Sequence, residues 1–117
     1  MVAGIYDITI EQGANFSLPL TWKDENGTPI NLTGYFARMQ IRQDYDADEA
    51  ILSLDSTVGG GIVLGGAFGT ITISIDAGAT ADLAQTDAVY DLELESVSGI
   101  VTRLVQGRVF ISREVTR

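Results

Sequence analysis

Hydrophobic and polar residues alternate without interruption in the stretch from Tyr90 to Glu95, which reads YDLELE. Tyr90, Leu92 and Leu94 share one face, and the three acidic residues between and after them share the other. A period of two residues is typical of a β-strand with one buried face and one face in water. We therefore predict a strand here, around which the other apolar segments can pack.

Seven further segments show the same alternation or a short apolar run between turn residues. They are the ranges 5–10, 15–23, 35–42, 51–54, 62–64, 70–75 and 100–111. Pro19 has no N–H to donate to a neighbouring strand, so the second segment is expected at a sheet edge or to carry a bulge. Arg103 and Gly107 interrupt the alternation of the last segment, which predicts a bulge near Gly107.

Helical periodicity is almost absent from the chain. The segment AGATADLAQ, residues 77–85, predicts one short helical turn near residues 79–85, with Thr80 as its N-cap. Short strands with turn signals about every ten residues predict an all-β fold, an antiparallel β-sandwich of 7–8 strands, with a small barrel as the alternative. No linker or repeat divides residues 1–117, which we interpret as a single domain.

Charged residues favour a particular strand order. Arg38 and Arg42 share the outer face of the third predicted strand, and Arg103 and Arg108 belong to the last one. If the YDLELE strand lies between these two strands, arginines on both sides pair with its carboxylates. That order is the one found in Greek-key sandwiches of the immunoglobulin type.

The sequence TDAVYDLEL also resembles the start of strand F in immunoglobulin-type domains, where an Asp-x-x-Tyr turn carries a corner tyrosine. Tyr90 would be that tyrosine, and Leu92 stands where antibody domains have their second cysteine. The cysteine pair and the strand-C tryptophan of antibody domains are both missing. The resemblance therefore implies an immunoglobulin-like sandwich and does not extend to the antibody family.

Composition argues against several classes of function. The net charge of −9 and the pI near 4.1 oppose binding to nucleic acids. No apolar run reaches the roughly 18 residues of a membrane span, and we recognise no signal peptide. The chain has neither histidine nor cysteine, which removes the usual general base, the usual zinc ligands and thiol chemistry. We expect a protein without enzymatic activity and without a cofactor.

One acidic stretch has the spacing of a metal site. Asp44, Asp46 and Asp48 alternate as at the start of a calcium-binding loop, and Asp55 follows at the place of the closing bidentate ligand. Glu49 replaces the glycine of such loops, and no helix is predicted on either side. We favour the alternative, a solvated acidic loop between two strands.

Two other sequence patterns could indicate either a functional site or ordinary structural residues. Asp91, Glu93 and Glu95 could form paired carboxylates, but the neighbouring arginines are expected to lower their pKa values, opposite to what a general acid needs. The glycines at 59–61 and 65–66 match no phosphate-binding motif. We interpret the carboxylates as a solvated strand face and the glycines as turn residues.

Three longer segments together resemble a known group of proteins. They read YDITIEQGANFSLPLTWKDENGTPINLTGYFARMQIR, GIVLGGAFGTITISIDAGATADL and VYDLELESVSGIVTRLVQGRVFISREVTR. They are similar to small β-sandwich virion proteins of tailed bacteriophages and prophages, and to the N-terminal domain of phage baseplate upper proteins. The resemblance covers nearly the whole chain and implies a virion component made in the cytoplasm of the host bacterium.

On this resemblance we expect a non-enzymatic structural protein of the phage particle, either a capsid decoration protein or an accessory module of the head or tail. It would pack against other virion proteins, with several copies associating in the particle, and would bind neither nucleic acid nor membrane. The predicted contact residues are Met1, Val2, Tyr6, Gly60, Arg113 and Arg117. The alternative is a carbohydrate- or host-surface-binding module of a phage tail or baseplate, with Tyr45 and Phe36 as the candidate exposed aromatics.

Overall fold

The computed structural model describes residues 3–84 and 87–116. These residues form nine strands: β1 (Gly4–Ile5), β2 (Ile8–Glu11), β3 (Phe16–Thr21), β4 (Phe36–Arg42), β5 (Leu52–Asp55), β6 (Ile62–Leu64), β7 (Thr70–Ile75), β8 (Asp87–Glu95) and β9 (Val101–Ser112). Two short helices accompany them, η1 (Gly66–Phe68) and α1 (Ala77–Ala81). Every predicted strand is present, and only the first is divided.

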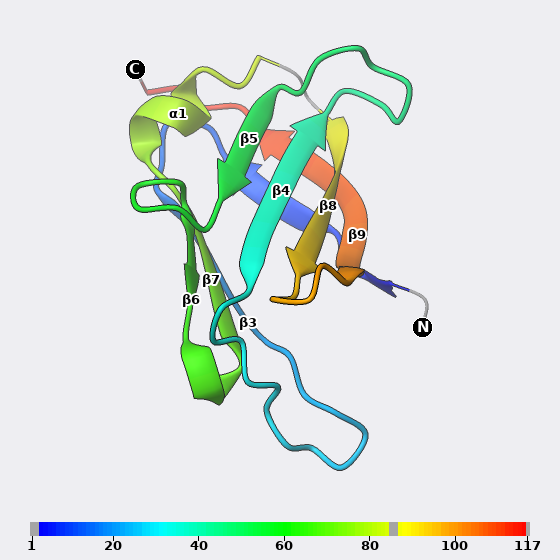
Figure 1. The fold of residues 1–117 in the computed structure, drawn as a ribbon. Helices are drawn as coiled ribbons and strands as arrows, with labels where there is room; N and C mark the ends of the chain where they lie inside the picture. The colour runs from blue at the N-terminus through cyan, green and yellow to red at the C-terminus, as the bar shows by residue number, and fades with distance from the viewer. Residues whose placement is uncertain (1–2, 85–86, 117) are drawn as a thin grey trace.

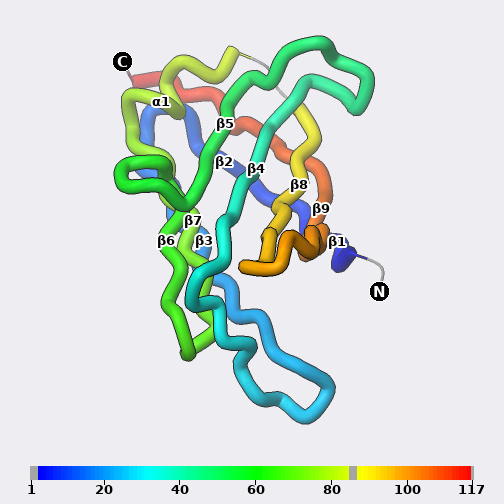
Figure 2. Tube along the Cα trace, in the orientation of Figure 1, coloured from blue at the N-terminus to red at the C-terminus, as the bar shows by residue number. Residues whose placement is uncertain are grey.

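The strands form two sheets that pack face to face (Figure 1). The larger sheet has the order β1-β9-β8-β4-β5, with β2 also paired to β9, and the smaller sheet has the order β3-β7-β6. The predicted all-β, immunoglobulin-like sandwich is confirmed, and so is the position of β8 between β4 and β9. The strand pairs are antiparallel except that β1 and β2 run parallel to β9, so the first and the last strands of the described chain lie in one sheet (Figure 2).

The core between the sheets consists of inward-facing aliphatic side chains from both, together with Tyr90. On β8, Tyr90, Leu92 and Leu94 are buried as their alternation predicts. The inward side chains of β3 are only half-buried, because β3 is an edge strand of the smaller sheet. This position agrees with the prediction from Pro19, which cannot donate a hydrogen bond to a further strand.

The first predicted strand is divided at Tyr6 and Asp7 into β1 and β2. Gly107 of β9 lies against this break, where an added Cβ atom would be 2.3 Å from the carbonyl oxygen of Tyr6. The Tyr90 hydroxyl donates a hydrogen bond to the same carbonyl at 2.5 Å. The Asp7 carboxylate accepts one from the backbone N–H of Arg108 at 2.8 Å. The glycine therefore allows two backbones to approach closely.

The prediction of a bulge near Gly107 is wrong, because the bulge lies three residues earlier in β9. Leu92 of β8 pairs with Val105, whereas the next residue of β8 pairs with Arg103, so Leu104 is an extra residue. An extra residue reverses the alternation of a strand. This is why Arg103 faces solvent while Val105 faces the core two positions later.

The helix begins earlier than predicted and has a different cap. Asp76 is the N-cap of α1, and its carboxylate accepts a hydrogen bond from a backbone N–H of the first turn at 2.8 Å. Thr80, the predicted cap, is fully buried within the helix. Its hydroxyl instead accepts a hydrogen bond from the N–H of Gly13 and donates one to the carbonyl of Ala14. Residue 85, the end of the predicted helix, lies outside the described residues.

Candidate functional site

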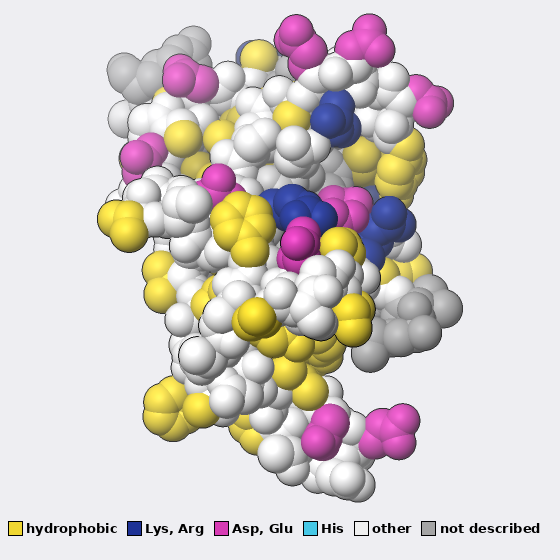
Figure 3. Space-filling view, viewed as in Figure 1, with side chains coloured by type: hydrophobic (Ala, Val, Ile, Leu, Met, Phe, Trp, Pro, Cys, Tyr) yellow, Lys and Arg dark blue, Asp and Glu magenta, His cyan; other side chains and the backbone are white. Residues whose placement is uncertain are grey.

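A polar depression of about 390 Å³ lies on the outer face of the larger sheet. We call it the sheet depression. The side chains of interest around it come from β4, β8, β9 and the β4–β5 loop, and they are Arg38, Gln40, Arg42, Tyr45, Val89, Asp91, Glu93 and Arg103. Figure 3 shows basic and acidic side chains gathered near the middle of the face that carries β4.

Strand register places opposite charges side by side in this depression. Arg38 of β4 is the cross-strand partner of Glu93 on β8, and Arg103 of β9 partners the same glutamate from the other side. One row further along, Gln40 of β4 partners Asp91 of β8. Because every second residue of a strand points to the same side, these rows form one continuous polar surface.

Ion pairs connect the rows, as the sequence predicts. Arg38 Nε lies 3.1 Å from Glu93 Oε1, and the Nη1 atom of the same arginine lies 3.1 Å from Glu95 Oε1. Arg103 Nε lies 3.4 Å from Asp91 Oδ2. Pairs as exposed as these contribute about 0.2–1 kcal/mol each. Their main effect is to orient the side chains that line the depression.

The titration of Asp91 differs from the prediction. Burial raises the pKa of Asp91, and repulsion from Glu93 raises it further, which outweighs the effect of the nearby arginines. The sequence predicts a lowered pKa because it reveals the arginines but not the partial burial of Asp91. The side chain remains 39% exposed, so its carboxylate can accept hydrogen bonds from a ligand.

Arg42 differs from the other two arginines of the depression. Its guanidinium donates hydrogen bonds to the carbonyl oxygen of Ala47 at 2.8 Å and to Gln40 Oε1 at 2.9 Å, both of which are neutral. Within residues 3–84 and 87–116, no carboxylate lies at ion-pair distance from it. Tyr45, which is 74% exposed, belongs to the same wall of the depression. A guanidinium without an ion-pair contact in these residues and an exposed aromatic ring therefore share one side.

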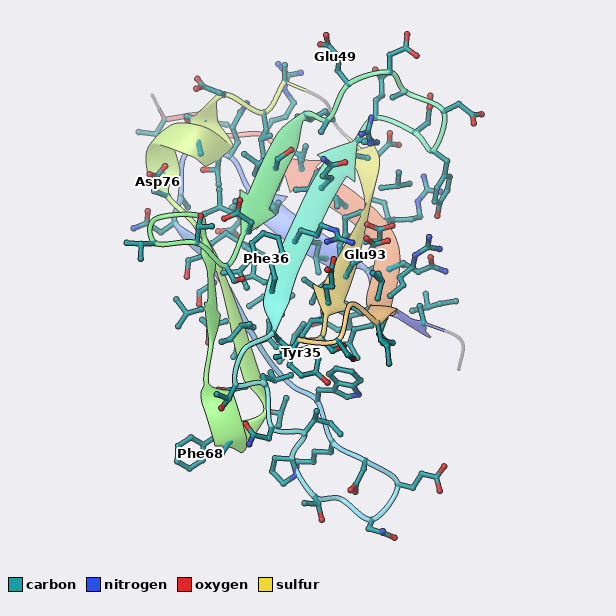
Figure 4. All side chains as sticks on the ribbon, in the orientation of Figure 1. Tyr35, Phe36, Glu49, Phe68, Asp76 and Glu93 are labelled. Atoms are coloured by element: carbon teal, nitrogen blue, oxygen red, sulfur yellow. The ribbon has the colours of Figure 1, made fainter. Side chains whose placement is uncertain are left out.

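Phe36, the second predicted aromatic, occupies the opposite end of β4. It is the cross-strand partner of Glu95 and is 38% exposed. Figure 4 shows Phe36 and Glu93 on the same side of the sheet. Phe36 is not part of the lining of the sheet depression, so Tyr45 is the predicted aromatic that the fold brings to the polar residues.

The four aspartates of the calcium prediction do not come together. Asp44, Asp46 and Asp48 belong to the β4–β5 loop, whereas Asp55 lies at the far end of β5. The Asp44 carboxylate accepts a hydrogen bond from the N–H of Asp46 at 3.0 Å. Hydrogen bonds from the hydroxyl and from the backbone N–H of Thr57 lower the pKa of Asp55. In the described part of the chain, no three potential ligands gather around a metal position.

A second hollow runs along the edge strand β6. It has a volume of about 760 Å³ and is lined mostly by apolar and small residues, among them Leu32, Tyr35, Val58, Ile62, Val63 and Leu64. We call it the β6 groove. Three apolar side chains on this flank are well exposed: Val58, Val63 and Phe68. Figure 4 shows Phe68 projecting into solvent at the far end of β6. The predicted contact residue Gly60 comes from this region, but Val58, Val63 and Phe68 are not among the predicted contacts. Alternation within the run Ile62–Leu64 does indicate that its middle residue faces away from the core.

The predicted contact residues have different surroundings. Three of them lie outside the described residues: Met1, Val2 and Arg117. Tyr6 is half-exposed at the break between β1 and β2, and Arg113 is exposed after β9. Gly60 lies beside the β6 groove, where an added Cβ atom would be 2.6 Å from the carbonyl oxygen of Asp55. Its role is to allow that close approach.

Comparison with protein-family models finds no match to this chain, and comparison with curated proteins also finds none. Among solved structures, the chain is similar to the extracellular domain of the voltage-gated sodium channel beta4 subunit, described as a parallel homodimer with a role in cell–cell adhesion. The sequence identity is 12%, the match covers 98% of this chain and 97% of the other, and the TM-score is 0.43. Similarity at this level does not define a family. In the described residues no helix is long and apolar enough to span a membrane.

Proposed function

We propose that the chain is a non-enzymatic structural protein of a bacteriophage particle, as the resemblance to small virion sandwiches implies. It would act by packing against a neighbouring virion subunit, with several copies in each particle. The β6 groove supports this proposal best, since it combines a free strand edge with exposed apolar side chains. Clusters of exposed apolar residues mark interaction surfaces in many proteins.

The free edge of β6 suggests how such packing occurs. In the described residues, β6 pairs only with β7, so its other edge carries backbone groups without a strand partner. An extended segment of a neighbouring virion subunit can pair with such an edge. Val63 and Phe68 would then be covered by that neighbour. The proposal includes capsid decoration and a head or tail position.

The test is incorporation of variants into phage particles. Val63→Lys places a charge on the β6 edge, and Ile100→Lys places one at an equally exposed position, 67% in both cases, in the turn before β9. Copies of the chain per purified particle would be measured by quantitative mass spectrometry, and their position by electron microscopy. We expect at least a tenfold loss for Val63→Lys and little change for Ile100→Lys. Absence of the wild-type chain from purified particles would refute the proposal.

A second candidate function is binding of carbohydrate on a host surface. It is favoured by one observation, the position of Tyr45 beside the arginines and carboxylates of the sheet depression. Sites for small ligands combine an apolar or aromatic surface with a few convergent polar groups. The sheet depression has this composition, whereas the β6 groove is mostly apolar.

A further inference from the structure

We propose that the sheet depression binds a saccharide that carries one carboxylate, with the carboxylate on Arg42 and the sugar ring against Tyr45. This inference rests on the second candidate function and names its ligand class. Different side chains of the depression specify the charge, the hydroxyl groups and the ring of the ligand.

The charge expected of the ligand follows from which arginines of the depression already form ion pairs with carboxylates. Arg38 is held by two glutamates and Arg103 by Asp91, so neither has a full charge to offer a ligand. Among the described residues, Arg42 donates to a backbone carbonyl and an amide oxygen, and no carboxylate lies at ion-pair distance from it. A guanidinium binds a carboxylate through parallel N–H donors, which is stronger than a bond to a neutral acceptor. A ligand carboxylate therefore has its best partner at Arg42.

The hydroxyl groups of a sugar match the centre of the depression. Gln40 and Asp91 are cross-strand partners in the row next to Arg42, and they supply an amide group and a partly exposed carboxylate. Sugar hydroxyls both donate and accept hydrogen bonds, so they can satisfy these two side chains together. Val89, the cross-strand partner of Arg42, adds a half-buried apolar surface in the same row.

The ring of the sugar matches Tyr45. This side chain is 74% exposed, so most of its ring is accessible to a ligand. Tyrosine presents a flat apolar face and a polar hydroxyl, and it supplies contact area with little loss of conformational freedom. The apolar C–H face of a pyranose can lie on that ring while its hydroxyls point to Gln40 and Asp91.

The ligand is expected to carry one carboxylate and not a series of them. The whole chain has a net charge of −9, which repels polyanions at long range. Two of the three arginines in the depression are already neutralised. A terminal uronic acid on an otherwise neutral glycan satisfies both conditions.

The experiment compares sugars that differ only in the carboxylate. D-glucuronate, D-glucose and acetate would be titrated into the isotope-labelled full chain, and binding followed by shifts of backbone amide signals in NMR spectra. We expect saturable shifts with glucuronate at the amides of Arg42, Tyr45 and Asp91. Affinity for glucose and for acetate is expected to be at least tenfold weaker.

Variants assign the two contacts separately. Arg42→Gln is expected to abolish the preference for glucuronate over glucose, and Tyr45→Ala to weaken both sugars while Tyr45→Phe retains binding. Arg108→Gln is the matched control, since this exposed arginine lies on β9 of the same sheet as Arg42 but outside the lining of the depression. If Arg42→Gln does not fold, Arg42→Lys keeps the charge and removes the planar donor pair, and it should lower glucuronate affinity severalfold.

The outcomes separate this inference from the proposed functions. Equal binding of glucose and glucuronate would refute the carboxylate at Arg42 and leave carbohydrate binding standing. Acetate binding as tightly as glucuronate would refute the saccharide. Lack of shifts with any of these probes at millimolar concentration would refute the inference. Incorporation into particles is measured independently and tests only the structural role.

Discussion

The hydroxyl of Thr80 connects α1 to the loop before β3, and its replacement tests how this end of the sandwich is held. The side chain is fully buried. Its Oγ1 accepts a hydrogen bond from the N–H of Gly13 at 3.1 Å and donates one to the carbonyl of Ala14 at 2.8 Å. Thr80→Val keeps the shape and removes the hydroxyl, whereas Thr80→Ser keeps the hydroxyl and removes a methyl group.

The two replacements have different expected costs. In Thr80→Val, two backbone groups lose their partner, and each buried unsatisfied group costs about 1–3 kcal/mol. Gly13 and Ala14 are only half-buried, so water compensates in part and a total near the lower end, about 2 kcal/mol, is expected. Thr80→Ser loses one buried methyl group, which costs about 0.8 kcal/mol. The valine variant is therefore expected to be the less stable one, although it preserves the volume.

Equilibrium unfolding in urea, followed by the fluorescence of Trp22 and by circular dichroism, measures the difference. With a slope of about 2 kcal/mol per molar urea, the midpoint should fall by about 1 M for valine and about 0.4 M for serine. Thr9→Val on the exposed side of β2 is the control, with an expected change within about 0.5 kcal/mol. A valine variant as stable as the serine variant would show that these hydrogen bonds contribute little and that the reasoning is wrong.

Three other predictions concern the β1–β2 break and the sheet depression. Tyr90→Phe removes the hydrogen bond to Tyr6 and should lower the free energy of unfolding by about 1 kcal/mol at pH 7. Burial raises the pKa of Tyr90 to about 12 from 10.0. As the pH rises, the unfolded chain therefore loses the Tyr90 hydroxyl proton before the folded chain does. Urea titrations should show that the stability of wild type falls more steeply than that of the variant between pH 10 and 12. Parallel pH dependences of the two proteins would contradict this expectation. Asp91→Asn should raise the melting temperature at pH 7, because burial raises the pKa of Asp91 and so disfavours its charge. That gain should vanish below about pH 4, where the carboxylate is protonated in both states, and a lower melting temperature at pH 7 would count against it. Gly107→Ala places a Cβ atom 2.3 Å from a backbone oxygen and should cost at least about 2 kcal/mol, with faster amide exchange in β1. In Gly4→Ala the added Cβ atom would lie 3.6 Å from the carbonyl oxygen of Leu104, so stability should change by less than about 0.5 kcal/mol. Equal effects of the two replacements would exclude a steric cause.

Much of the fold follows from alternation along the chain. The YDLELE strand, its flanking arginines and the edge position of Pro19 were all predicted, because each depends on which side of a strand a residue faces or on what its own backbone can donate. The candidate site was predicted in part. Tyr45 was identified as an exposed aromatic, but its position beside Arg42 and Asp91 results from the path of the β4–β5 loop.

Features that depend on contacts between distant segments were not predictable in the same way. Thr80 has the residue type of a helix cap, yet its hydroxyl binds a loop 66 residues away in sequence, at Ala14. Tyr90 resembles a corner tyrosine, yet it donates to the carbonyl of Tyr6 and so fastens the N-terminal strands to the larger sheet. The glycine at position 107 has an ordinary strand neighbourhood in sequence, and only the approach of β1 and β2 explains it.

The physical reason is the range of the interactions. Whether a segment becomes a strand, and which of its faces is buried, depends on the residues of that segment and on the hydrophobic effect. Which hydroxyl meets which carbonyl, and how far a carboxylate such as Asp91 loses water, depends on backbones that pack together only after the chain has folded. The sandwich could therefore be recognised from the alternation of its residues, whereas its depression, its groove and the pKa of Asp91 required the packed structure.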